Sequence, residues 1–89
     1  MHEQALMRDL ISRIVSVAEA EGASGVTRVT VRLGALSHFT PEHFREHYRD
    51  AAHGTIAEGA AIDATMDEST TDPTAQGVLL ESVELEETA

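Results

Sequence analysis

The first three residues, Met1, His2 and Glu3, have types and spacing that could bind a metal ion. A free amine at Met1, the backbone nitrogen of His2 and the His2 imidazole could close two fused chelate rings on one cation. Three nitrogens in one plane favour tetragonal Ni(II) or Cu(II), whereas Zn(II) prefers a tetrahedron. Glu3 adds a carboxylate as a fourth ligand or as an acceptor beside the imidazole. We expect Met1 to be retained, because methionine is normally removed only before a small residue. The alternative is that His2 is an ordinary exposed residue at a frayed chain end.

A second histidine motif lies in the middle of the chain, where His43, Glu46 and His47 form the pattern H-x-x-E-H. In inverted zinc peptidases two such imidazoles hold zinc while the glutamate activates water. A catalytic zinc also needs a third protein ligand and a substrate cleft, for which 89 residues leave little room. The same residues also fit a metal-binding patch completed by Asp50, or a solvated helix face. Because no pattern indicates a nucleophile, a phosphate loop or a buried general acid, the sequence does not predict an enzyme.

The composition excludes several classes of partner and cofactor. The formal net charge is −10 and the six basic residues are all arginine, so we expect no binding to nucleic acid or to anionic membranes. The absence of cysteine excludes disulfides, thiolate zinc sites and iron–sulfur clusters. We expect a cytoplasmic protein with neither a signal peptide nor a membrane span. A single domain of 89 residues buries a modest core, to which a homodimer contact could add.

Helical spacing of apolar residues predicts a first helix that ends near Glu21. Seven side chains are expected to form its buried stripe, namely Leu6, Leu10, Ile14 and Val17, flanked by Met7, Ile11 and Ala18. Gly22 and Gly25 follow, and glycine at that place lets the chain turn through positive φ. From Thr27 to Leu33 apolar and polar residues alternate. This alternation predicts a strand with one face in the core and the other facing water or a partner.

A second helix is predicted to begin after Thr40. Thr40 is a good N-cap, and Pro41 suits the first helical position. Phe39 can contact Phe44 across this cap as a hydrophobic staple. Four side chains are expected to point inward from the helix, namely Phe44, Tyr48, Ala51 and Ala52. Gly54 should end it.

Two further strands are predicted, separated by a polar loop over residues 68–77. The first covers residues 61–67, where alternation places Ile62, Ala64 and Met66 on one side. The second covers residues 78–86, and its alternation slips around residues 79–80 in the manner of a β-bulge. The order helix, strand, helix, strand, strand predicts an α+β fold with both helices on one face of a three-stranded mixed sheet.

Several blocks of sequence follow one another in a recognisable order. The blocks are Met1-His2-Glu3 with Leu6, Val26-Thr27-Arg28-Val29, Leu33-Gly34-Ala35-Leu36-Ser37, Pro41-Glu42, Gly54-Thr55-Ile56-Ala57-Glu58-Gly59-Ala60 and Ser82-Val83-Glu84-Leu85-Glu86. Together they closely resemble the HypA/HybF family of hydrogenase-maturation proteins. The resemblance runs from residue 1 to about residue 67, and the last block is similar to the closing strand of the family. Several blocks in register are more specific than any single motif.

The resemblance implies a nickel metallochaperone. Members of the family work with a HypB-type GTPase to load nickel into the large subunit of nickel–iron hydrogenases. In that role His2 is the nickel ligand, and the amine of Met1 and the carboxylate of Glu3 contribute to the same site. The resemblance therefore favours a metal-binding His2 over an ordinary exposed one.

One difference from the family is large. Family members carry a zinc domain with two Cys-x-x-Cys pairs between the strands predicted here over residues 61–67 and 78–86, whereas this chain has only residues 68–77 there and no cysteine. We therefore expect residues 1–89 to form a single nickel-binding domain without structural zinc. One interpretation is a minimal metallochaperone that keeps the nickel-binding end. The other is a non-enzymatic accessory or scaffold subunit of a hydrogenase assembly, derived from a HypA-like ancestor.

Overall fold

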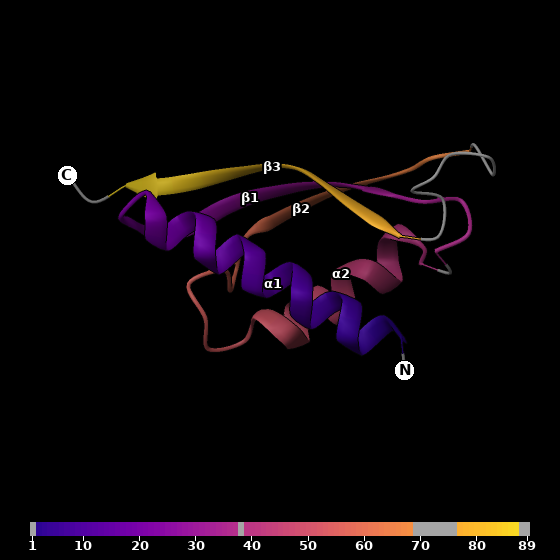
Figure 1. Cartoon of the computed structure of the whole chain (residues 1–89), viewed down its shortest axis with the longest axis horizontal. Helices are drawn as coiled ribbons and strands as arrows, with labels where there is room; N and C mark the ends of the chain where they lie inside the picture. The colour runs from indigo at the N-terminus through magenta and orange to yellow at the C-terminus, as the bar shows by residue number, and fades with distance from the viewer. Residues whose placement is uncertain (1, 38, 69–76, 88–89) are drawn as a thin grey trace.

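The computed structural model describes residues 2–37, 39–68 and 77–87, and for residues 2 and 3 it describes the backbone alone. The five predicted elements are present in the predicted order. They are α1 (His2–Ala20), β1 (Ala23–Leu33), α2 (Pro41–Ala52), β2 (Ala61–Met66) and β3 (Val78–Glu87). Both helices lie on the same face of the sheet (Figure 1), so the predicted α+β fold is confirmed. Neither described helix is long and apolar enough to cross a membrane.

β1 is the central strand of the sheet, whose order is β2-β1-β3. It pairs in parallel with β2 and antiparallel with β3, which makes the sheet mixed, as predicted. The parallel pair needs a crossover connection, and α2 lies within it. The slip predicted in the last strand is also present. Thr30 pairs with Ser82 and the next residue, Val31, pairs with Leu80. Glu81 is thus the extra residue of a bulge, one position after the predicted slip.

The two outer strands meet at the end of β1, where Leu33 pairs with both Met66 and Val78. The Gly34 N–H donates a hydrogen bond of 2.9 Å to the Gly77 carbonyl oxygen, which holds the start of β3 beside the end of β1. Because both strands flank the same residue, a short connection is enough to join them. Residues 69–76 of the predicted loop lie outside the described residues.

The hydrophobic core lies between the sheet and the two helices. Its buried members in the regular elements are Met7, Leu10, Ile11, Ile14 and Ala18 from α1, Val26, Val29, Val31 and Leu33 from β1, and Phe44, Tyr48 and Ala52 from α2. The prediction for Val17 was wrong, because its side chain is 43% exposed. At 100° per residue the five buried α1 positions centre near the direction of Met7, and Val17 points roughly 80° away from it. Ala18 lies within roughly 20° of that direction and is fully buried, as predicted.

The predicted start of α2 is confirmed. The Thr40 hydroxyl accepts a hydrogen bond of 3.2 Å from the His43 N–H, and Pro41 occupies the first turn. Phe39 contacts Phe44 edge to face, with ring centroids 5.6 Å apart. The prediction that Ala51 points into the core was wrong. Its side chain is exposed and lines a groove between α1 and α2, because the two helices do not close over that turn of α2.

The predicted helix ends are confirmed at two glycines. Gly22 follows α1 with φ of 68°, and Gly54 follows α2 with φ of 82°. Both angles lie in the left-handed region, where a residue with a Cβ is strained. Gly25, in contrast, lies inside β1 and takes no part in the turn.

The outer face of the sheet is largely polar, although Leu79, which pairs with Arg32, is exposed there. Arg28 forms an ion pair of 3.5 Å with Glu84, and Arg32 forms one of 3.0 Å with Glu81. Val29, Val31 and Leu33, on the opposite face of β1, are fully buried. The alternation in β1 therefore separates core from solvent as predicted, and no apolar layer is needed above the sheet.

Candidate functional site

The predicted metal-binding motif lies at the N-terminal end of α1. The helix begins at His2, so the His2 and Glu3 backbones belong to its first turn. Met1 and the side chains of His2 and Glu3 lie outside the described residues, and their role as ligands stays a prediction. The backbone is nevertheless compatible with that role. The first four N–H groups of a helix have no acceptor within the helix, so the His2 nitrogen could lose its proton to a metal without breaking a helical hydrogen bond.

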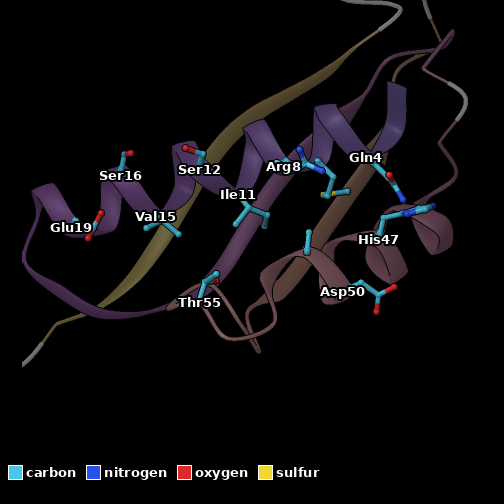
Figure 2. Close-up of a pocket in the computed structure, with 12 residues that line it drawn as sticks. Gln4, Arg8, Ile11, Ser12, Val15, Ser16, Glu19, His47, Asp50 and Thr55 are labelled. Atoms are coloured by element: carbon cyan, nitrogen blue, oxygen red, sulfur yellow. The ribbon is translucent and has the colours of Figure 1, made fainter. Parts of the chain in front are cut away.

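An open groove of about 690 Å³ runs between α1 and α2 and begins near this first turn. Met7, Ile11 and Val15 give it an apolar floor from α1, while His47 and Asp50 line it from α2. Figure 2 shows the Gln4 side chain directed toward His47 at one end of the groove. The His47 imidazole therefore lies close to the start of α1, although the two are more than forty residues apart in sequence.

The two histidines of the H-x-x-E-H pattern share a helix face, as predicted. The ring centroids of His43 and His47 are 6.4 Å apart, and His47 also contacts Phe39 edge to face at 5.9 Å. Among the described residues, however, no three histidine, aspartate or glutamate side chains are grouped closely enough to hold a metal ion. The side chains of His43, His47 and Asp50 are all among the described residues, so this result covers the predicted three-ligand patch as well. The patch is not assembled. A peptidase-type zinc site is likewise not assembled in this part of the chain.

Tyr48 joins α2 to the turn that precedes β2. Its hydroxyl donates a hydrogen bond of 2.9 Å to the Ala57 carbonyl oxygen, and the side chain is buried. Burial disfavours the charged phenolate and raises the pKa of Tyr48 to about 12. On the surface of the same turn the His53 Nδ1 atom lies 2.6 Å from a carboxylate oxygen of Glu58. The first contact ties the segment between α2 and β2 to the helix, and the second lies within the segment itself.

A second, smaller concavity of about 310 Å³ lies where α2 passes the start of β2. Arg45 and Arg49 line it from the helix, and residues 59–62 line it from the chain entering β2. No sequence pattern identified this place as a site. The only signal was the spacing of two arginines four residues apart, which indicates a shared helix face but not what lies opposite.

Comparison with known proteins gives consistent results. The family model described as "Hydrogenase/urease nickel incorporation, metallochaperone, hypA" matches residues 1–73. A hydrogenase maturation factor HypA from Methanosarcina mazei is 36% identical over 66 residues, which cover 74% of this chain and 48% of that protein. The corresponding factor from Chlorobium limicola is 36% identical over 63 residues, covering 71% of this chain and 54% of that protein. The chain thus spans about half the length of the curated relatives it matches.

The fold also has a counterpart among solved structures. The solution structure of the Ni metallochaperone HypA from Helicobacter pylori aligns with a TM-score of 0.77 over 97% of this chain and 98% of that chain. The sequence identity is 15%, so this likeness concerns the fold. The matching family is described as a metallochaperone, which agrees with the prediction that the chain is not an enzyme.

Proposed function

Because this chain belongs to the HypA family of hydrogenase and urease nickel-incorporation proteins, we propose that it binds Ni(II) at Met1, His2 and Glu3 and passes the ion on during maturation of a nickel–iron hydrogenase. The observation that carries the proposal is the family match over residues 1–73, which includes the motif itself. The chemistry of the motif supports it independently, since an amine, an amide nitrogen and an imidazole in one plane suit Ni(II).

The helix that follows the motif bears on how the ion would be held. A helix N-terminus carries a partial positive charge that disfavours a cation. Deprotonation of the His2 amide and coordination of the Glu3 carboxylate would each bring one negative charge, which together balance the two positive charges of Ni(II). The neutral complex would then sit at the helix end without electrostatic cost, and its exposed position at the end of α1 would leave it accessible to an acceptor protein.

Proton release gives the proposal its first test. An unperturbed α-amine titrates at about 8 and an imidazole at about 6.5, and the amide nitrogen loses its proton only on metal binding. Ni(II) affinity should therefore fall about a hundredfold as the pH is lowered from 7.5 to 6.5, because the amide proton contributes a factor of about ten, the amine somewhat less than ten, and the imidazole, half protonated at pH 6.5, about two. Isothermal titration calorimetry of protein with an untagged N-terminus measures this dependence. An affinity that does not change with pH would refute the three-nitrogen coordination.

We also propose the context in which the chain acts. A HypB-type GTPase and the hydrogenase large subunit are its expected partners, in the cytoplasm. Residues 1–89 would form one nickel-binding domain in which residues 68–77 stand in place of the family's zinc domain. Structural zinc held by thiolates is not expected, since the chain contains no cysteine.

The alternative is an accessory or scaffold subunit of a hydrogenase assembly. It is motivated by the absence of cysteine, because residues 68–77 stand where the family carries its thiolate zinc domain. Affinity purification of the protein at native expression level separates the two functions. A stable stoichiometric complex with hydrogenase subunits, whose nickel content is unaffected by His2→Ala, would favour the scaffold. Nickel content that falls with this substitution supports the metallochaperone.

A further inference from the structure

One edge of β2 is not paired with any strand in the described part of the chain and could pair with a strand from outside. Within the described residues β1 is the only strand paired with it. The Asp67 N–H donates to the Leu33 carbonyl oxygen of β1 at 2.8 Å. Because successive residues of a strand direct their backbone groups to opposite sides, Met66, Ala64 and Ile62 direct theirs away from β1. The edge therefore presents a row of backbone donors and acceptors spaced two residues apart.

Two arginines of α2 lie at the start of this edge. Arg45 Nε donates a long hydrogen bond of 3.5 Å to the Ile62 carbonyl oxygen, one of the groups directed away from β1. Arg45 and Arg49 line the concavity of about 310 Å³ together with Tyr48 and residues 59–62. The arginine side chains and the unpaired edge of β2 thus face the same space.

Among the described residues, neither arginine has an acidic partner. No carboxylate in the described part of the chain lies within ion-pair distance of Arg45 or Arg49, although the formal net charge is −10. The nearby Glu58 carboxylate is bonded to His53 instead. In contrast, Arg13, Arg28 and Arg32 each form an ion pair. Two guanidinium groups are therefore available to a carboxylate from outside the chain, and guanidinium groups bind carboxylates with directional, charge-assisted hydrogen bonds.

From these observations we infer that the β2 edge is a docking site for an extended acidic segment of a partner protein, which adds a fourth strand to the sheet beside β2 and places a carboxylate between Arg45 and Arg49. Backbone hydrogen bonds to Ile62, Ala64 and Met66 supply the pairing, as in other cases of strand addition. A backbone N–H of the incoming strand replaces Arg45 as the donor to the Ile62 carbonyl oxygen, and the Arg45 guanidinium can then bind the carboxylate.

The other end of the same edge favours an apolar residue. Met66 is 46% exposed and lies on the helix-facing side of β2, the same side as Ile62. The two are four positions apart in an extended chain, which is a distance of about 13 Å. The segment that fits best therefore has an acidic residue and an apolar residue four positions apart, on one face of the strand.

The opposite edge of the sheet does not fit the same segment. β3 is also an outer strand, but it carries Glu81, Glu84, Glu86 and Glu87. Two of these carboxylates already pair with Arg28 and Arg32, and the remainder would repel an acidic strand. Charge thus favours an acidic residue on the helix-facing side of β2, where Arg45 and Arg49 lie, whereas the carboxylate of Asp63 belongs to the outer face of that strand. The same repulsion disfavours pairing of two copies of this chain through β3.

The test uses the full chain without metal, so its outcome does not depend on nickel binding. The probe is an acetylated and amidated heptapeptide, Thr-Glu-Thr-Val-Thr-Leu-Thr, which carries the acidic and apolar residues four positions apart. Titration into isotopically labelled protein is followed by amide resonances in two-dimensional NMR. Saturable shifts are expected at Ile62, Ala64 and Met66 and not along β3. A matched peptide with glutamine in place of glutamate should bind at least about fivefold more weakly, since it lacks the charge.

Protein variants separate strand addition from general charge attraction. Arg45→Gln and Arg49→Gln should each weaken binding of the glutamate peptide about fivefold and leave the glutamine peptide unaffected. Arg13→Gln, which removes the same charge from α1, is the control and should change nothing. Ala64→Pro removes a donor that faces away from β1, a position where an edge strand tolerates proline, and should abolish binding while circular dichroism shows the fold retained.

Four results would overturn the inference. They are equal affinity for the two peptides, shifts confined to β3, an Arg13→Gln effect as large as that of Arg49→Gln, and complete displacement of the peptide by millimolar acetate. The last would mean that the two arginines bind a small carboxylate and that no strand is added.

Discussion

Alkaline pH should destabilise this protein, and ionisation of one buried side chain, Tyr48, should account for a separable share of the loss. Tyr48 is the only tyrosine, and the chain has no tryptophan, so its ionisation can be followed by near-ultraviolet absorbance without interference. Burial raises its pKa from 10.0 to about 12 in the folded state. In the unfolded chain the phenol is solvated and titrates at about 10. Between these two values the unfolded chain has lost the proton and the folded protein has kept it.

The sign and size of the effect follow from this difference. The unfolded state binds fewer protons than the folded state in this interval, so the free energy of unfolding falls as the pH rises. The stabilisation is complete below pH 10 and is lost as the pH rises through 12. One pKa unit corresponds to about 1.4 kcal/mol, so the total loss is about 2 to 3 kcal/mol. That is a substantial share of the stability of a small domain.

Chemical denaturation at a series of pH values from 8 to 12 measures the loss, and Tyr48→Phe is the control. The variant should lose about 1 to 2 kcal/mol at neutral pH, because the Ala57 carbonyl oxygen is left without the hydroxyl that now donates to it at 2.9 Å. Above pH 10 its stability should fall less than that of the parent protein, and the difference isolates the phenol from the general repulsion of an acidic chain. Two results would contradict this account. One is ionisation of Tyr48 with the ordinary pKa of a solvated phenol, about 10. The other is an equal fall in the free energy of unfolding of both proteins above pH 10.

Two further predictions concern the helices. Thr40→Ala removes the hydroxyl that accepts from the His43 N–H at 3.2 Å and should lower the free energy of unfolding by about 1 kcal/mol in urea denaturation, whereas Thr40→Ser should restore most of it. Ile14→Ala should cost about 2 to 5 kcal/mol because Ile14 is fully buried, while Val17→Ala on the same helix should cost less than about 1 kcal/mol; similar losses for the two would contradict the observed orientation of α1.

Most of the elements could be predicted from the sequence because their signals are local. The boundaries of α2 depend on Thr40, Pro41 and Gly54, and the capping bond and the positive φ both lie within a few residues of the helix. The buried face of β1 follows from the alternation of apolar and polar residues, which is typical of a strand with one face in the core and the other in solvent. Val17 marks the limit of such local signals. Helical spacing placed both Val17 and Ala18 in the buried stripe after Ile14, and only the direction from which the sheet packs on the helix shows that Ala18 is buried and Val17 is not.

What could not be predicted depends on contacts between distant segments. Two arginines four residues apart are an ordinary helix pattern until β2 places the Ile62 carbonyl oxygen beside Arg45. The approach of Gln4 to His47 likewise needs the packing of α1 on α2. The strand order β2-β1-β3 is a property of the whole chain, since it pairs the first strand with both later ones. The proposed metal ligands are a different case, because their chemistry was readable from three consecutive residues and owed nothing to the fold.

Ni(II) calorimetry on untagged protein at neutral pH decides whether the nickel site exists where we propose it. The parent chain is compared with His2→Ala and with His47→Ala as the matched imidazole control. We expect one Ni(II) per chain, loss of that binding in His2→Ala, and unchanged stoichiometry and affinity in His47→Ala. Stoichiometric binding that survives His2→Ala, or that is lost in His47→Ala alone, would contradict a nickel site built on the first residues of α1.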